Sequence, residues 1–270
     1  MYLALFNSER WNGNLLAYDL DASTGAISGF PSWSAASRLD SRDILTRPRT
    51  LLTYNGTSGV ALQWSQLTTA QKNDFRTNCS GGLDNVATGM ARHGYLRGDR
   101  GCEFSSGAIC KYDDGTNVYT AKGLRERGSR LGDIVHSGPV YVGAPESNWP
   151  DVAPFPGTVG DTYTEYRTAN ASRPGVIYVG GNDGMMHGFA QSNGDEVLGY
   201  VPDMLFSANA LAGLHYLTDP AYAHRYSVDL TASVADVYAK TTVGGTTSWK
   251  TVLVGGLRGG GRGIDRKSVV

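Results

Sequence analysis

Short runs of β-forming residues alternate with glycine-containing turns along much of the chain. The clearest stretch holds the runs Val176–Val179, Met185–Phe189 and Glu196–Val201, separated by turns at Asn182-Asp183-Gly184 and Ser192-Asn193-Gly194-Asp195. Runs of this length bounded by such turns are typical of antiparallel strands joined by hairpins. The pattern predicts a three-stranded meander, which is most of one blade of a β-propeller.

A repeated motif extends this prediction. Two or three β-formers precede a glycine in Gly138–Gly143, Gly175–Gly180 and Lys250–Gly255, and the final glycines lie 37 and 75 residues apart. Because 75 is close to twice 37, we expect one copy of the motif in each four-stranded blade. The glycines expected to let strands approach closely near blade turns are Gly143, Gly180, Gly181, Gly255 and Gly256.

Further strands are predicted toward both ends of the sequence. Tyr2–Phe6 and Leu15–Leu20 precede a turn at Asp21–Gly25 and then Trp33, which repeats the strand–turn–strand pattern and predicts an earlier blade. The later predicted strands are Tyr226–Val228, Val234–Tyr238 and Trp249–Val254, with a turn at Gly244-Gly245.

Two segments carry helical patterns. Thr68–Arg76 is one, and Asp203–Leu214 has apolar residues spaced for a short amphipathic helix packed on the propeller. The stretches 80–89, 104–117 and 145–173 are predicted to be loops. The fold class is therefore predicted as all-β, an incomplete β-propeller with quinoprotein-like blades and a few short helices in loops.

Composition and charge exclude several classes of protein. With 40% hydrophobic residues, 15 Tyr, 7 Phe and 5 Trp among 270, the chain is not of disordered composition. No apolar run approaches the roughly 18 residues of a membrane span. The 24 Lys and Arg nearly balance 25 Asp and Glu, and the densest basic stretch, Lys122–Arg130, is interrupted by Glu126. We interpret that stretch as a solvated loop and expect no nucleic-acid partner.

The three cysteines, Cys79, Cys102 and Cys110, lack the paired spacing of a zinc site. Cys102 and Cys110 would close a small loop as a disulfide if the protein is exported. The alternative is that all three are ordinary thiols.

Both ends of the sequence indicate a fragment. The first residues lack a basic leader and resemble a strand already under way, so we expect no signal peptide here. The last six, Asp265–Val270, are what the codons GAT CGG AAG AGC GTC GTG encode, the start of a common sequencing-library adapter. We expect residues 265–270 to be adapter read-through and residues 1–264 to be a partial propeller domain.

Several motifs occur in a fixed order: LGDIVHSGPVYVGAP (131–145), VIYVGGNDGMMHGF (176–189), GYVP (199–202), YAHRYSVD (222–229) and WKTVLVGGLRGGGRGI (249–264), preceded by NLLAYDLDASTGAI (14–27), WSAA (33–36) and YLRGDR (95–100). Together they resemble the β-propeller domain of the PilY/PilC family, the type IV pilus tip adhesins of Gram-negative bacteria. The resemblance covers nearly the whole chain except its last six residues.

The resemblance implies a secreted protein of the pilus tip, the cell surface or the outer membrane. It implies roles in pilus biogenesis, opposition to retraction, cell adhesion, twitching motility and surface sensing. The implied partners are minor pilins, the pilus tip complex, and a host or abiotic surface.

Calcium is the cofactor that the resemblance implies for the full-length family, at an Asp-x-Asp-x-Asp loop further along the domain. The nearest runs here, Tyr112–Asn117 and Asp19–Asp21, offer too few spaced oxygens for a calcium shell. We therefore place calcium on no residue of this chain.

Arg97-Gly98-Asp99 is an integrin-type tripeptide, and the resemblance links such a tripeptide to host-cell binding in one branch of the family. Exposed on a turn, its arginine and aspartate would engage a partner's carboxylate and metal. The alternative is that Arg97 and Asp99 stabilise a loop between blades.

An enzymatic function is not expected. Asp133, His136 and Ser137 suggest a hydrolase set, but a triad is defined by geometry and the chain has no Gly-x-Ser-x-Gly elbow. We expect His136 to satisfy backbone groups, His187 to be packed or at a blade edge, and His215 and His224 to hold no metal. The blades also resemble those of pyrroloquinoline-quinone dehydrogenases, but the adjacent cysteine pair of those enzymes is missing. A further alternative is an extracellular propeller that binds glycan or protein.

Overall fold

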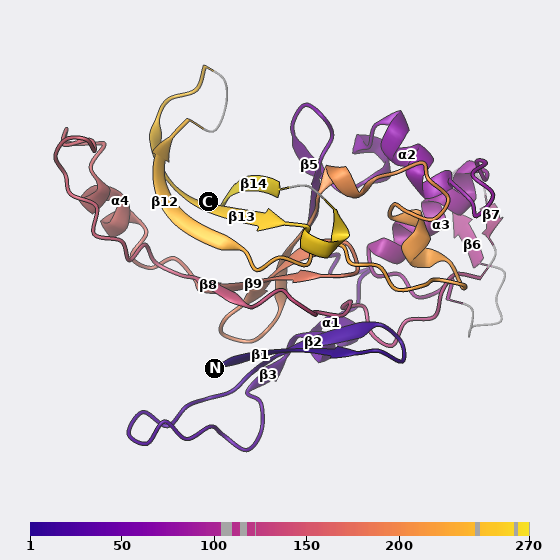
Figure 1. Cartoon of the computed structure of the whole chain (residues 1–270), viewed down its shortest axis with the longest axis horizontal. Helices are drawn as coiled ribbons and strands as arrows, with labels where there is room; N and C mark the ends of the chain where they lie inside the picture. Colours follow the sequence, from indigo (N-terminus) through magenta and orange to yellow (C-terminus); the bar gives the residue numbers. More distant parts are fainter. Residues whose placement is uncertain (104–109, 114–117, 122, 241–243, 262–263, 270) are drawn as a thin grey trace.

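The computed structural model describes residues 1–103, 110–113, 118–121, 123–240, 244–261 and 264–269 (Figure 1). In the strands 110–113, 118–121 and 264–269 only the backbone is described. Most of the loop predicted over 104–117 therefore lies outside the described residues.

A central six-stranded sheet, antiparallel except for one parallel pair, contains the predicted meander. Strands β8 (Val140–Val142), β9 (Val176–Gly181), β10 (Met185–Ala190) and β11 (Glu196–Val201) lie side by side in this order. Gly184 has a φ of +90° in the tight turn between β9 and β10, a conformation that favours glycine. The meander is confirmed, and with β8 it makes the four antiparallel strands of one blade.

The prediction of one motif copy per blade is wrong. β8 and β9, which carry the first two copies, pair directly with each other, with Tyr141 opposite Ile177. Their 37-residue spacing comes from the long connection between them, which contains helix α4 (Tyr163–Ala169) rather than loop alone. A capping box between Thr162 and Glu165 starts this helix.

Two further sheets cover the two faces of the central sheet (Figure 1). Because successive side chains of a strand point to opposite faces, Ile177 packs with Trp33 of the first sheet and Tyr178 with Leu253 of the second. The predicted earlier blade corresponds to the first of these sheets. The strands of the two sheets are β1 (Tyr2–Asn7), β2 (Asn12–Ala17) and β3 (Trp33–Ser34), then β12 (Ser233–Ala239), β13 (Ser248–Gly256) and β14 (Ile264–Val269).

A mainly helical segment extends the central sheet beyond β11 with two further strands. Strand β4 (Leu51–Tyr54) runs parallel to β11, and Phe75 and Leu96 of the helices share a core with Val201. The predicted helix at 68–76 is confirmed as α2, whereas the loop predicted at 80–89 is wrong from residue 86, where α3 begins. The elements of this segment and its neighbours are α1 (Ala35–Ser41), β5 (Gly59–Ala61), η1 (Trp64–Gln66), α2 (Thr69–Arg76), α3 (Val86–Leu96), β6 (Cys110–Asp113) and β7 (Val118–Ala121).

The fold class needs a correction, because helices α1 to α4 make the architecture mixed rather than all-β. The three stacked sheets resemble consecutive propeller blades, but the described residues form no closed ring. No helix in the described parts of the chain has the length and apolar character to span a membrane.

The helix predicted at Asp203–Leu214 is also wrong. Only 3₁₀ turns form, η3 (Asp203–Leu205) and η4 (His215–Thr218), with a further one, η5 (Arg258–Gly260), near the end. The backbone N–H groups of Ser207 and Leu214 donate to the buried carboxylate of Asp74 instead of to helical carbonyls. Residues 226–228 likewise form no strand, because the N–H of Ser227 donates to the side chain of Asn182.

Candidate functional site

A buried chain of charges crosses the junction between the helical segment and the central sheet. Arg49, which is 4% exposed, donates two hydrogen bonds to the carboxylate of Glu196, at 2.6 and 2.7 Å. It also donates to the backbone carbonyl of Leu96, the last residue of α3, at 3.2 Å. A bidentate arginine–carboxylate pair has fixed geometry, so it holds the end of α3 against β11.

His187 continues this chain of charges. Its Nδ1 lies 2.8 Å from Glu196 Oε1 and its Nε2 lies 3.1 Å from Asp183 Oδ1. Burial lowers the pKa of His187, but Asp183 and Glu196 outweigh that effect and raise it to about 9. The ring is therefore protonated at neutral pH and donates to both carboxylates. His187 is fully buried, so the expectation of a packed residue is confirmed and that of a blade-edge residue is not.

Sequence patterns did not identify this network. Arg49 and Glu196 are 147 residues apart, and nothing local marks Arg49 as buried. The signals that existed were Asp183 in the Asn-Asp-Gly turn and Glu196 at the start of a strand, two charges that flank a histidine.

The tripeptide Arg97-Gly98-Asp99 lies at the C-terminal end of α3. The N–H of Gly98 donates to Tyr95 O and that of Asp99 donates to Gly94 O, which is the bonding pattern of a Schellman motif. Gly98 has a φ of +105°, as this helix ending requires. The glycine of the tripeptide is thus accounted for by helix termination.

The two charged side chains of the tripeptide are half-buried and bonded within the molecule. Arg97 Nη1 donates to Leu62 O at 2.5 Å, and Asp99 Oδ1 accepts from the N–H of Gly101 at 2.8 Å. This geometry agrees with a loop-stabilising role. The adhesion role stays a prediction.

The remaining candidate histidines each pair with a distant aspartate. His136 Nδ1 lies 2.7 Å from Asp229, and His215 Nδ1 lies 2.8 Å from Asp74. His224 Nε2 lies 2.8 Å from Asp133, so Asp133 is not the partner of His136. Ser137 Oγ donates to Leu230 O and accepts from the N–H of Gly180. The three residues of the hydrolase set therefore have separate partners and form no triad.

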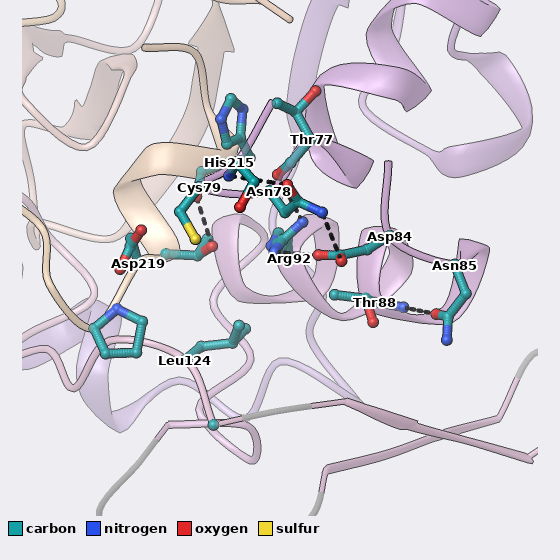
Figure 2. Close-up of a pocket in the computed structure, with 14 residues that line it drawn as sticks. Thr77, Asn78, Cys79, Asp84, Asn85, Thr88, Arg92, Leu124, His215 and Asp219 are labelled. Atoms are coloured by element: carbon teal, nitrogen blue, oxygen red, sulfur yellow. Dashed lines mark hydrogen bonds and ion pairs between the residues drawn. The ribbon is translucent and has the colours of Figure 1, made fainter. Parts of the chain in front are cut away.

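A polar pocket of about 570 Å³ lies between α2, α3 and η4 (Figure 2). Within it, Arg92 and Asp84 form an ion pair at 2.7 Å. Cys79, which is free and exposed, lines the pocket with His215, but its sulfur is directed away from that ring in Figure 2. No hydrogen bond joins the thiol to the imidazole among the described residues, so the pair is not arranged for nucleophilic catalysis.

Cys102 is disulfide-bonded, which excludes the alternative of three ordinary thiols. The chain has one further cysteine, Cys110, whose side chain lies outside the described residues.

The described side chains offer no site that fits a calcium ion. Within the described ranges, no group of three or more His, Cys, Asp or Glu side chains is placed to hold a metal. The carboxylate of Asp21, one of the nearest candidates, accepts from the N–H groups of Ser23 and Thr24 in its own turn. The side chains of Tyr112–Asn117 are outside the described residues.

Comparison with known proteins defines the class first. Residues 131–268 match the PilY1 beta-propeller domain, and this stretch holds the central blade and the sheet β12–β14. Over 97% of its length the chain is similar to proteins named type IV pilus biogenesis factors. It is 34% identical over 263 residues to the "Type IV pilus biogenesis factor PilY1 homolog" of Xylella fastidiosa, and the alignment covers 97% of this chain and 18% of that protein. It is 31% identical over 268 residues to "Type IV pilus biogenesis factor PilY1" of Pseudomonas aeruginosa, covering 97% of the chain and 20% of that protein.

The chain therefore belongs to the PilY1 β-propeller family, as its sequence motifs indicated. It spans about a fifth of the length of these relatives. No solved structure matches it.

Proposed function

We propose that this chain is part of an exported, non-catalytic factor of the type IV pilus tip. In this proposal it acts in pilus biogenesis, surface attachment and twitching motility, and it contacts minor pilins and the tip complex. The observation that carries the proposal is its similarity, over 97% of its length, to proteins named as type IV pilus biogenesis factors. The separate partners of Asp133, His136 and Ser137 support a non-catalytic role.

Deletion of the encoding region from the parent gene tests the biogenesis role. We expect sheared surface pilin to disappear while the cellular pilin pool remains, and to return on complementation. If the factor opposes retraction, surface pili should also return when the retraction ATPase is removed. An unchanged amount of surface pilin in the deletion strain would refute the proposal.

Adhesion through Arg97-Gly98-Asp99 is a finer part of the proposal. Asp99→Glu keeps the charge but alters the tripeptide, so it should lower attachment to integrin-bearing cells while the number of surface pili stays normal. Asp43→Glu is the matched control, because Asp43 also caps its own loop, accepting from the N–H of Leu45. Equal attachment of both variants would remove the tripeptide from the proposal.

A further inference from the structure

An arginine-lined pocket of about 510 Å³ adjoins the C-terminal ends of α1 and α3. Its apolar part is formed by Ile44, Leu45 and Pro48, and Leu45 is 89% exposed. None of its described lining residues is Ser, Thr, Asn, Gln or an aromatic residue. The charged lining residues are Arg42, Arg49, Arg97, Arg100, Arg130, Asp43 and Asp99.

The two aspartates are engaged by their own loops. Asp43 accepts from the N–H of Leu45 and the hydroxyl of Thr46, and Asp99 accepts from the N–H of Gly101. In the part of the chain that the structure describes, neither carboxylate forms an ion pair with an arginine of the pocket, whose ion pairs are Arg49 with Glu196 and Arg100 with Glu103.

Two guanidinium groups keep unused donors. Arg130 donates through Nε and Nη1 to backbone carbonyls that include Gly98 O and Asp40 O, and Arg100 donates through Nε and Nη2 to Glu103. Among the described residues, Arg130 Nη2 and Arg100 Nη1 have no hydrogen-bond partner. Among the described residues, the buried side-chain nitrogens and oxygens without a partner are His93 Nδ1 and His215 Nε2. Arg130 Nη2 and Arg100 Nη1 are not among them, so both nitrogens reach solvent.

The surroundings of Arg130 are crowded with positive charge. Burial lowers the pKa of its guanidinium, and the charges of Arg127, Arg100 and Arg49 lower it further, against the opposing effect of Asp40. An anion in the pocket would relieve this repulsion.

We propose that this pocket binds an acidic peptide segment of a partner protein, with one carboxylate on Arg100 and Arg130 and an adjacent aliphatic side chain on Leu45 and Pro48. Guanidinium groups match the planar geometry of carboxylates. A glycan fits less well, because sugar hydroxyls need neutral hydrogen-bonding side chains and an aromatic platform, and the described part of the lining offers neither.

Titration of the full chain with acetyl-Leu-Glu-amide and acetyl-Leu-Gln-amide tests the proposal. We expect the Glu peptide to bind at least tenfold more tightly, since only it carries the carboxylate. Arg100→Gln should weaken that binding at least tenfold. Arg47→Gln, at an exposed arginine outside the pocket, should leave it unchanged. Leu45→Ser changes an exposed side chain without threatening the fold, and it should weaken binding several-fold.

Four results would overturn the proposal. These are the absence of saturable binding, equal affinity for the two peptides, equal effects of Arg100→Gln and Arg47→Gln, and binding of trigalacturonate or inorganic phosphate at least as tight as that of the Glu peptide. The last would assign the pocket to an acidic glycan or a simple anion. All four readouts are independent of pilus assembly, so they test the pocket separately from the proposed function.

Discussion

The side chain of His187 connects two carboxylates that belong to opposite ends of one hairpin. Asp183 lies in the turn before β10 and accepts from the N–H of Gly132, while Glu196 opens β11 and binds Arg49. The network thus joins the loop before β8, the hairpin and the helical segment. Its charges are buried, so each depends on the others for compensation.

Replacing His187 by Gln should destabilise the chain strongly. The substitution removes the positive charge between two buried carboxylates, and loss of one partner of a buried pair costs about 3–5 kcal/mol. Urea unfolding measures this loss. The same substitution at His136, whose side chain is 37% exposed, is the matched control and should cost less. Equal losses at the two positions would contradict a buried ionic role for His187.

Because the pKa of His187 is raised, the free energy of unfolding should fall as the pH rises. The folded-state pKa is about 9 and the unfolded value is about 6.5, so between these values the folded chain holds a proton that the unfolded chain has lost. The stabilisation is complete below pH 6.5 and is lost as the pH rises through 9, by at most about 1.4 kcal/mol per pH unit. The unfolding free energies of wild type and His187→Gln should therefore converge between pH 6.5 and 9. A constant difference would contradict a protonated His187.

Sequence reasoning located few of these residues, for a physical reason. Asp183, His187 and Glu196 lie within 14 residues of the sequence, but nothing in the sequence joined them into a network, and their buried role depends on Arg49. The pairs His215–Asp74 and His224–Asp133 likewise join residues 141 and 91 positions apart. Such contacts depend on tertiary packing, which local patterns do not encode.

At the scale of elements, strand glycines differ in what surrounds them. A Cβ on Gly180 of β9 would clash with the backbone carbonyl of Val228, whereas one on Gly255 of β13 would meet only the terminal methyl of Met186, at 3.1 Å. The predicted close approach at Gly180 is therefore to the non-strand backbone at Val228 rather than to a second strand.

Gly180→Ala should accordingly lower the free energy of unfolding by about 1–3 kcal/mol, because a backbone carbonyl has to shift. Gly255→Ala should cost less, since the end of the Met186 side chain can move. Chemical denaturation of both variants measures the difference. A larger loss at Gly255 than at Gly180 would contradict the described packing.

Elements with strong local signals were predictable from sequence. The strands of the hairpin β10–β11 follow from β-forming runs separated by glycine-containing turns, and the predicted helix at Thr68–Arg76 begins at a capping box on Thr68. The helix predicted at Asp203–Leu214 had the right apolar spacing, but Asp74 takes the backbone N–H groups it would have used. The prediction of one motif copy per blade failed for the same reason: the long connection that contains α4 gives β8 and β9 the spacing expected of two separate blades, although they pair within one sheet.

At the scale of the whole molecule, the sequence comparisons place this chain in the PilY1 β-propeller family, while calcium has no site among the described residues. Calcium at millimolar concentration should therefore leave the melting temperature of the full chain unchanged within about 1 °C, because a ligand that does not bind the folded state does not stabilise it. A saturable rise that chelator reverses would place a calcium site on this chain.

The central claim is that this chain performs the work of the corresponding segment of a PilY1 protein. Replacement of the aligned segment of Pseudomonas aeruginosa PilY1 by this chain, in a strain lacking its own copy, tests it most directly by the amount of sheared surface pilin. We predict that the chimera restores surface pili and that the same chimera with His187→Gln restores fewer. A chimera that is exported at the normal level yet leaves the cells without pili would contradict the claim.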